Sequence, residues 1–126
     1  MFSHIMLGAN DIEESKNFYD AILGVFGYEP GVIDPKGRVF YFGPKGVFSL
    51  SKPIDGGEAT GGNGSTVGFQ GETDELINQW HAAGLAHGGT AIEDPPGMRE
   101  GSGRALYLAY LRDPSGNKIC AMKVHK

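Results

Sequence analysis

Four polar side chains that could do chemistry stand on predicted strands far apart in the sequence: His4, Ser49, Thr66 and Cys120. An imidazole is an acid or base near neutral pH and a common metal ligand. A thiol that loses its proton is a nucleophile or a metal ligand. If the fold brings these groups to one cavity, we expect ligand binding at a polar wall, acid-base chemistry centred on His4, or a metal held by His4 and Cys120.

Strand alternation predicts which residues line that cavity. Successive side chains of a strand point to opposite faces, so Ile5 and Leu7 pack on the helices while His4 and Met6 face inward. A wall with several small polar residues is unusual for a core that only packs, because buried hydroxyls need hydrogen-bond partners. The same alternation in the other strands predicts an inner wall of His4, Met6, Ser49, Ser51, Thr66, Gly68, Cys120 and Met122.

Each of these groups also has an ordinary structural interpretation. His4 fits a core histidine whose ring is hydrogen-bonded to Ser49 or Thr66. Cys120 fits a small buried hydrophobic residue, although His4 across the cavity would lower its pKa. The remaining histidines do not share a helix face and are predicted to lie on the surface or in the C-terminal tail: His81, His87 and His125.

A glycine-rich stretch from Pro95 to Gly103 carries Arg99 and is followed directly by Arg104. It is long enough to fold over the cavity mouth as a lid, and Arg99 would then meet an anionic ligand. A solvated loop is the alternative. Three tyrosines are candidate pocket walls whose strand phase the sequence does not fix: Tyr41, Tyr107 and Tyr110.

The elements that position these residues follow one order twice: a strand, a helix and three strands. Asn10 and Asp11 fit the N-cap of the first helix and Thr73 that of the second. The helix aromatics are predicted to lie in the core: Phe18, Tyr19, Phe26 and Trp80. The first copy has strands at Phe2 to Leu7, near Val32, at Val39 to Phe42 and at Val47 to Ser51. The second has strands at Thr66 to Gln70, Thr90 to Ile92, Leu106 to Leu111 and Lys118 to Val124.

We expect a single α+β domain over residues 1–126, with module one at 1–53, a glycine-rich linker at 54–64 and module two at 65–126. A formal charge of −4 without a Lys/Arg cluster gives no footprint for nucleic acid or for anionic lipid. The single cysteine excludes an internal disulfide, and the N-terminal residues show no pattern of a secretion signal. The expected location is therefore cytoplasmic.

Two segments together resemble the glyoxalase/bleomycin-resistance/dioxygenase superfamily, also called the vicinal oxygen chelate fold. They are the opening FSHIMLGANDIEESKNFYDAILGVFGY and the closing YLAYLRDPSGNKICAM, in which the turn Arg112 to Lys118 precedes the last strand. The resemblance implies two βαβββ modules whose curled mixed sheets surround a shared cavity, usually completed by dimerisation. It also implies that enzymes of this kind hold a divalent metal there, which chelates two vicinal oxygens of the substrate.

The metal-ligand positions that the resemblance implies fall on His4, Ser49, Thr66 and Cys120. Only His4 is a usual ligand for a hard or borderline divalent ion, because neutral hydroxyls bind weakly and Cys120 stands where such endings carry Glu. His4 and Cys120 together give fewer ligands than the three that a catalytic zinc site normally keeps. We therefore expect a degenerate metal site and no cofactor, with a divalent metal as the alternative.

The sequence thus leaves two functions open. The first is a homodimeric protein that binds a small organic molecule without chemistry. The second is a metal-dependent enzyme acting on a small oxygenated substrate, such as a glyoxalase-like lyase, an isomerase or a ring-cleaving dioxygenase; in either case no catalytic residue is assigned. The predicted ligand-binding residues are His4, Met6, Ser49, Thr66, Arg99, Cys120 and Met122.

Overall fold

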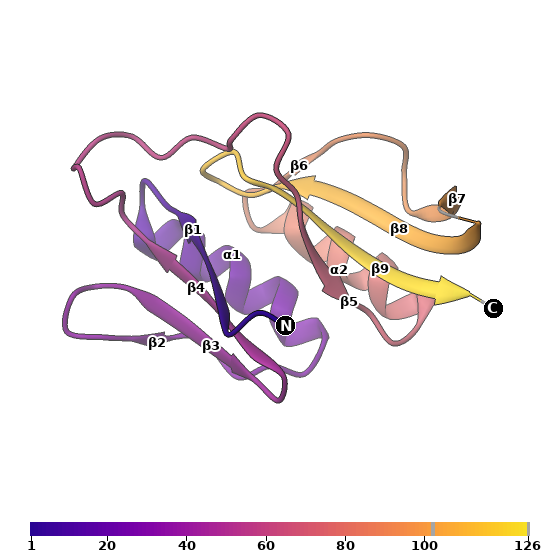
Figure 1. Cartoon of the computed structure of the whole chain (residues 1–126), viewed down its shortest axis with the longest axis horizontal. Coiled ribbons are helices and arrows are strands. Elements are labelled where there is room, and N and C mark those ends of the chain that lie inside the picture. Colours follow the sequence, from indigo (N-terminus) through magenta and orange to yellow (C-terminus); the bar gives the residue numbers. More distant parts are fainter. Residues whose placement is uncertain (102, 126) are drawn as a thin grey trace.

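A computed structural model describes residues 1–101 and 103–125 of the chain. Its first half forms a mixed four-stranded sheet in the order β1-β4-β3-β2, with β1 parallel to β4 and the other neighbours antiparallel. One helix covers one face of this sheet (Figure 1). The elements are β1 (His4–Gly8), α1 (Ile12–Val25), β2 (Val32–Ile33), β3 (Val39–Gly43) and β4 (Gly46–Ser51).

The second half repeats this plan with one additional strand. Its sheet has the order β5-β9-β8-β6, and β7 pairs with β8 outside that path. The edge strand β5 runs parallel to β9, as β1 does to β4. The elements are β5 (Val67–Gln70), α2 (Asp74–Ala86), β6 (Thr90–Ala91), β7 (Gly97–Gly101), β8 (Arg104–Arg112) and β9 (Lys118–His125).

Strand β7 corrects the prediction of a loop or lid at Pro95 to Gly103. Residues Gly97 to Gly101 pair antiparallel with Arg104 to Leu108 and form a hairpin on the sheet. Gly103, with φ of 74°, stands in the turn between the two strands. Of the glycines that suggested a flexible loop, Gly103 therefore serves the turn, whereas Gly97 and Gly101 are paired in β7. Ser102 in this stretch and Lys126 at the end of the second predicted module lie outside the described residues.

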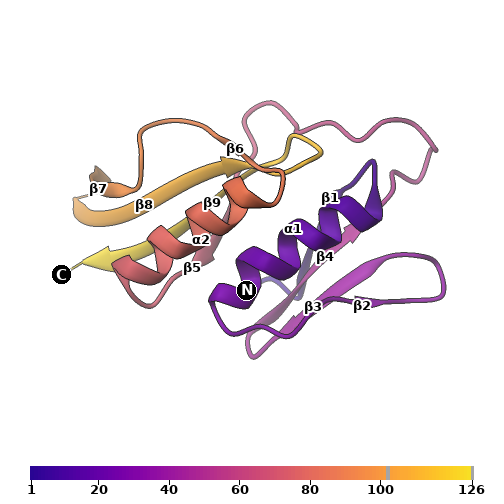
Figure 2. The same cartoon turned by 180° about the vertical axis from the view of Figure 1, so that it is seen from behind.

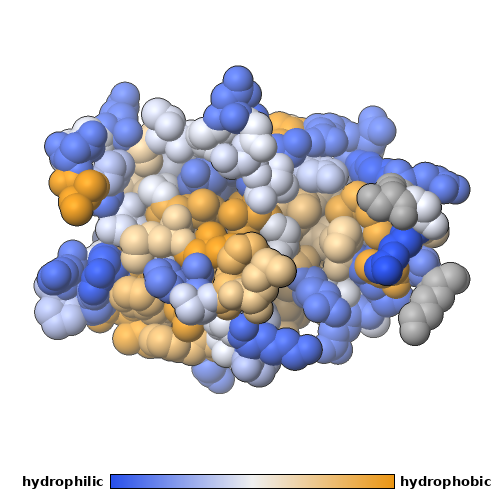
Figure 3. All heavy atoms as spheres, viewed as in Figure 1, coloured by the Kyte–Doolittle hydropathy of each residue, from blue (hydrophilic) through white to orange (hydrophobic). Residues whose placement is uncertain are grey.

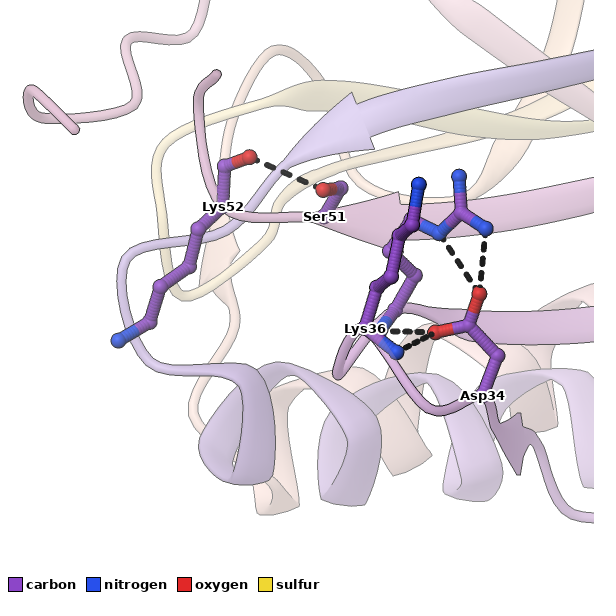
Figure 4. Close-up of polar contacts among 5 residues, drawn as sticks. Asp34, Lys36, Ser51 and Lys52 are labelled. Carbon is purple, nitrogen blue, oxygen red and sulfur yellow. Dashed lines mark hydrogen bonds and ion pairs between the residues drawn. The ribbon is translucent and has the colours of Figure 1, made fainter. Parts of the chain in front are cut away.

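Both helices begin at the predicted caps. The Asp11 carboxylate accepts a hydrogen bond from the backbone N–H of Glu14 at 3.0 Å, and the Thr73 hydroxyl accepts one from that of Leu76 at 3.1 Å. Each bond satisfies an amide that the helix itself cannot pair. In the turn after β2, the Asp34 carboxylate likewise accepts hydrogen bonds from backbone N–H groups, those of Lys36 and Arg38 (Figure 4).

The core lies between the helices and the sheets, with both helices on the same side of the molecule (Figure 2). The predicted core aromatics Phe18, Tyr19 and Trp80 have no exposed surface, and Phe26 packs against them. Phe48 of the first sheet meets Phe69 of the second edge to face, with ring centroids 5.1 Å apart. Because these rings come from different modules, they join the two halves into one core.

The linker between the halves is irregular, as predicted, and Asn10 holds it. The Asn10 side chain accepts a hydrogen bond from the backbone N–H of Ala59 at 2.7 Å and donates one to the carbonyl of the same residue at 3.4 Å. No helix among the described residues is long and apolar enough to cross a membrane.

A candidate ligand site between the two modules

The faces of the two sheets that the helices do not cover lie side by side, with β1 and β5 as neighbouring edges (Figure 1). Strand register places the predicted inner residues there. Met6 lies opposite Ser49 across β1 and β4, and Cys120 lies opposite Gly68 across β9 and β5. Figure 3, which looks onto these faces, shows apolar side chains gathered near the centre. We call this surface the open face.

A cavity of about 540 Å³ lies between β1 and β5, and we call it the seam cavity. Its apolar walls come from both modules and include Ile5, Val47, Phe48, Val67 and Phe69. Its volume is in the range of pockets that bind small organic ligands. The edge-to-face pair of Phe48 and Phe69 therefore forms part of a wall that both modules share.

The polar groups of the seam cavity also come from both modules. Ser3, His4 and Lys45 belong to the first module, and Gln70 and Glu72 belong to the second. Apolar walls with polar groups that fix the orientation of a ligand are a usual feature of small-molecule sites. A second cavity of about 550 Å³ adjoins it along the end of β5.

The structure brings together only some of the predicted ligand-binding residues. His4 lines the seam cavity, whereas Cys120 and Met122 line the second cavity. Gly68, Phe69, Gln70 and Glu72 line both, so the two cavities meet at β5. The other predicted ligand-binding residues line neither cavity: Met6, Ser49, Thr66 and Arg99.

His4 is an exposed residue, which corrects the interpretation of a core histidine bonded to Ser49 or Thr66. Its Nδ1 lies 2.8 Å from the Ser3 hydroxyl instead. Ser49 is fully buried, and its hydroxyl donates to the backbone carbonyl of Ile5 at 2.9 Å. The buried Ser49 hydroxyl therefore finds its acceptor in the backbone of the neighbouring strand β1, and it needs no other side chain of the predicted wall.

Two further predicted wall residues have separate environments. Thr66 is exposed and precedes β5. The Ser51 hydroxyl donates to the backbone carbonyl of Lys52 at 2.9 Å, at the end of β4 (Figure 4). Neither hydroxyl joins the Ser49 hydroxyl in a shared polar cluster among the described hydrogen bonds.

Cys120 is buried, and burial raises the pKa of its thiol to about 11. Nearby Lys118 acts in the opposite direction but does not offset the loss of solvent. The thiol is therefore protonated at neutral pH, which agrees with the interpretation of Cys120 as a small buried residue. A side-chain carbon added at Gly68 would lie 3.2 Å from the sulfur, so glycine leaves the room that this thiol occupies.

These residues do not form a good metal site. Two of the four implied ligand positions, Ser49 and Thr66, carry neutral hydroxyls, which bind divalent ions weakly. Within residues 1–101 and 103–125, no three His, Cys, Asp or Glu side chains are grouped closely enough to hold an ion. The donor set thus provides His4 as its single conventional ligand, fewer than a catalytic site normally keeps.

Arg99 is anchored on the second sheet and is not a mobile lid residue. Its guanidinium donates to the backbone carbonyls of Leu108 and Asp94, both at 2.7 Å. It also donates to the carbonyls of Gly97 and Pro95 and lies 5.7 Å from the centre of the Tyr110 ring. With most of its donors already bonded, Arg99 ties β7 to β8.

Two histidines and the tyrosines take positions that the sequence did not fix. His81 is half-buried, so it is only partly the surface residue that was predicted, and burial lowers its pKa. His125 is paired in β9 and its Nε2 lies 2.7 Å from Asp74, so it is not in a tail. Tyr41 is buried in the core and also lines the seam cavity, as the candidate pocket-wall assignment predicted. Tyr107 bonds to Asn78 of α2, whereas Tyr110 lies on the open face opposite Cys120.

The sequence reasoning missed Lys45, Gln70 and Glu72 as cavity residues. Lys45 stands in the two-residue turn of the β3–β4 hairpin, where it reads only as a turn residue. Glu72 stands between β5 and the N-cap of α2. Both connecting segments are recognisable in the sequence, but only the packing of one module beside the other brings Lys45 and Glu72 to one cavity.

Comparison with known proteins gives the context of this site. A sequence model of the Glyoxalase/Bleomycin resistance protein/Dioxygenase superfamily matches residues 1–121. A glyoxalase/bleomycin resistance protein from Albidiferax ferrireducens T118 is 56% identical, with a TM-score of 0.93 over 97% of this chain and 98% of that one. A glyoxalase/bleomycin resistance protein/dioxygenase family enzyme from Burkholderia phytofirmans PsJN is 21% identical, with a TM-score of 0.74 over 98% of both chains, and shows the fold alone. No curated protein matches the chain.

Proposed function

The chain belongs to the glyoxalase/bleomycin resistance protein/dioxygenase superfamily, and we propose that it binds a small organic molecule in the seam cavity without metal chemistry. The observation that carries this proposal is a cavity of about 540 Å³ whose wall combines apolar and polar side chains, both kinds coming from both modules. A ligand there would touch Phe48 and Phe69 at once. Its binding would therefore add contacts across the boundary between the modules.

The alternative, a metal-dependent lyase, isomerase or dioxygenase, needs a centre that these residues fit poorly. A Lewis-acid metal must be held by several good donors, such as neutral imidazoles, thiolates or carboxylates. Here two of the four implied ligand positions, Ser49 and Thr66, carry neutral hydroxyls, which bind divalent ions weakly. The donor chemistry therefore favours ligand binding over a metal-assisted reaction.

The test combines a metal assay with a ligand screen. Protein purified without chelators is expected to carry less than about one tenth of an equivalent of divalent metal, because too few good donors converge. A library of small organic molecules, screened by thermal shift, is expected to yield compounds that raise the melting temperature. Stoichiometric metal bound at His4 would contradict the proposal, and so would a library without any stabilising compound.

Dimerisation forms a second part of the proposal. Met6, Val32 and Phe42 are exposed by 40%, 56% and 65% of their surface, and strand register places all three on the open face. Apolar side chains grouped on one face of a monomer favour association. A second copy of the chain would cover them in a two-fold arrangement. A cytoplasmic location completes the proposal, supported by one unpaired thiol that a reducing compartment keeps intact.

A further inference from the structure

The seam cavity presents two hydrogen-bond donors of the first module at its polar side. The Ser3 hydroxyl lies 2.8 Å from Nδ1 of His4. When that hydroxyl donates to Nδ1, a neutral ring carries its hydrogen on Nε2, which then acts as a donor. No other hydrogen bond to the His4 ring is made by the described residues. In this tautomer His4 would offer its Nε2–H to an acceptor in the cavity.

Lys45 supplies the second donor and a positive charge. It lies in the turn that joins β3 to β4, and β4 is the strand that pairs with His4 of β1. Both side chains line the seam cavity. Among the described residues no carboxylate forms an ion pair with Lys45. An anionic group in the cavity would therefore be its first close counter-charge.

Glu72 is the one carboxylate of the seam cavity among the described residues, and it belongs to the other module. It immediately precedes Thr73, the N-cap of α2, where the partial positive charge of the helix terminus favours a carboxylate. Like Lys45, Glu72 forms no ion pair among the described residues, but the adjacent N-terminus of α2 gives it electrostatic support from its own module. This asymmetry favours a ligand anion over a ligand cation.

We propose that the seam cavity binds a small organic carboxylate whose aromatic or aliphatic body packs on Phe48 and Phe69 and whose carboxylate bonds to His4 and Lys45. This inference rests on the proposed function and names the ligand class of the same site. Hydrogen bonds to an ionised group are stronger than those between neutral groups, so the carboxylate would set the orientation. The apolar walls would supply most of the buried contact area.

The experiment compares probes with one body and different head groups. Benzoate, phenylacetate, 3-phenylpropanoate and hexanoate are each paired with the corresponding neutral amide and with an amine of similar length. Thermal shift and calorimetry then measure binding to the full-length chain. At least one carboxylate is expected to bind about tenfold more tightly than its amide, since a charged partner adds that much to a hydrogen bond, and the amine is expected to bind more weakly still.

Substitution of Lys45 separates charge from packing. Lys45→Met keeps the aliphatic stem and is expected to remove most of the preference for the carboxylate while leaving amide binding unchanged. Lys52→Met, an exposed lysine outside the cavity residues, is the matched control and is expected to keep the preference. Equal melting temperatures of the unliganded variants would show that both remain folded.

The outcomes distinguish this inference from the proposed function. If library compounds bind but carboxylates and amides bind equally, or if Lys45→Met keeps the preference, the carboxylate assignment is wrong and small-molecule binding stands. Preferential binding of the amines likewise overturns the assignment. If no probe and no library compound binds, the proposed function itself fails.

Discussion

The hydroxyl of Tyr19 in α1 donates a 2.7 Å hydrogen bond to Oδ2 of Asp113, a residue 94 positions later in the turn before β9. Both residues are buried. Asn117 donates to the same carboxylate oxygen at 2.9 Å and to the backbone carbonyl of Gly8 at 2.8 Å. This polar group therefore fastens the last turn of the second module to the first helix and the first strand.

Removing the Tyr19 hydroxyl tests that connection. Tyr19→Phe is expected to lower the free energy of unfolding by about 1 to 3 kcal/mol, because a buried carboxylate loses a donor that no solvent replaces. Tyr28→Phe, which alters a 36% exposed ring, is expected to change it little. Urea unfolding of the three proteins measures the effect. Equal losses in the two variants would mean that the bond to Asp113 contributes nothing specific.

The same contact predicts behaviour at alkaline pH. Burial, and then the charge and hydrogen bond of Asp113, raise the pKa of Tyr19 well above its ordinary value of 10.0. The neutral phenol is therefore favoured in the folded state, so its contribution to stability is complete below pH 10 and declines as the pH rises beyond it. Tyr19→Phe is expected to reduce this alkaline loss of stability.

The environment of Asp20 predicts that the stability of the fold decreases in acid. Burial alone would raise the pKa of this carboxyl, but hydrogen bonds from the Gly31 amide, Lys16 and Tyr41 outweigh it, and the pKa is lowered from 3.8. The ionised form is favoured in the folded state, so its contribution is present above pH 3.8 and is lost as the pH falls through the folded value.

Urea unfolding between about pH 6 and about pH 3 measures this contribution. Wild type is expected to lose stability over that interval, and Asp20→Asn is expected to lose less because its side chain does not titrate. Asp55→Asn, in the exposed linker, is the matched control and is expected to follow wild type. An Asp20→Asn curve parallel to that of wild type would contradict the assignment.

Cys120 is expected to react slowly with thiol reagents. With its pKa raised from 9.0 to about 11, the fraction of thiolate near pH 8 is about a hundredfold lower than in an unfolded chain. Burial slows access further. The rate of reaction with Ellman's reagent, in buffer and in urea, measures the difference, and Cys120→Ser gives the blank because this is the single cysteine. A native rate equal to the unfolded one would argue against a protected thiol.

Dimerisation through the open face predicts a mass of twice 13.4 kDa in light scattering at micromolar concentration. Phe42→Glu is expected to shift the protein toward the monomer, since a charge would stand on the covered apolar surface. Ile54→Glu introduces the same charge at a fully exposed linker residue and is the control. A monomeric wild type would disprove the proposed association, and a dimeric Phe42→Glu would place it on another surface.

Local sequence signals predicted most of the fold because they act over a few residues. Asp11 and Thr73 cap helices through their own side chains, and the Asp113 to Gly116 turn closes with a 2.9 Å backbone bond and a φ of 89° at Gly116. Strand β7 escaped prediction because its glycines resemble those of a loop. It forms a strand because β8 supplies backbone hydrogen-bond partners, and this cause lies outside the residues of β7 themselves.

The sequence by itself predicted the two repeated modules and the faces of their strands, and it placed hydroxyls at two of the four metal-ligand positions that the family resemblance implies. Only the tertiary structure decided where those residues sit. The Ser49 hydroxyl is bonded to the backbone carbonyl of Ile5, and the Arg99 guanidinium is bonded to backbone carbonyls. Lys45 and Glu72 come to one cavity from different modules. Alternation fixes the face of a strand, which is a local property of the backbone. Whether that face is packed, exposed or hollow depends on which distant elements lie against it.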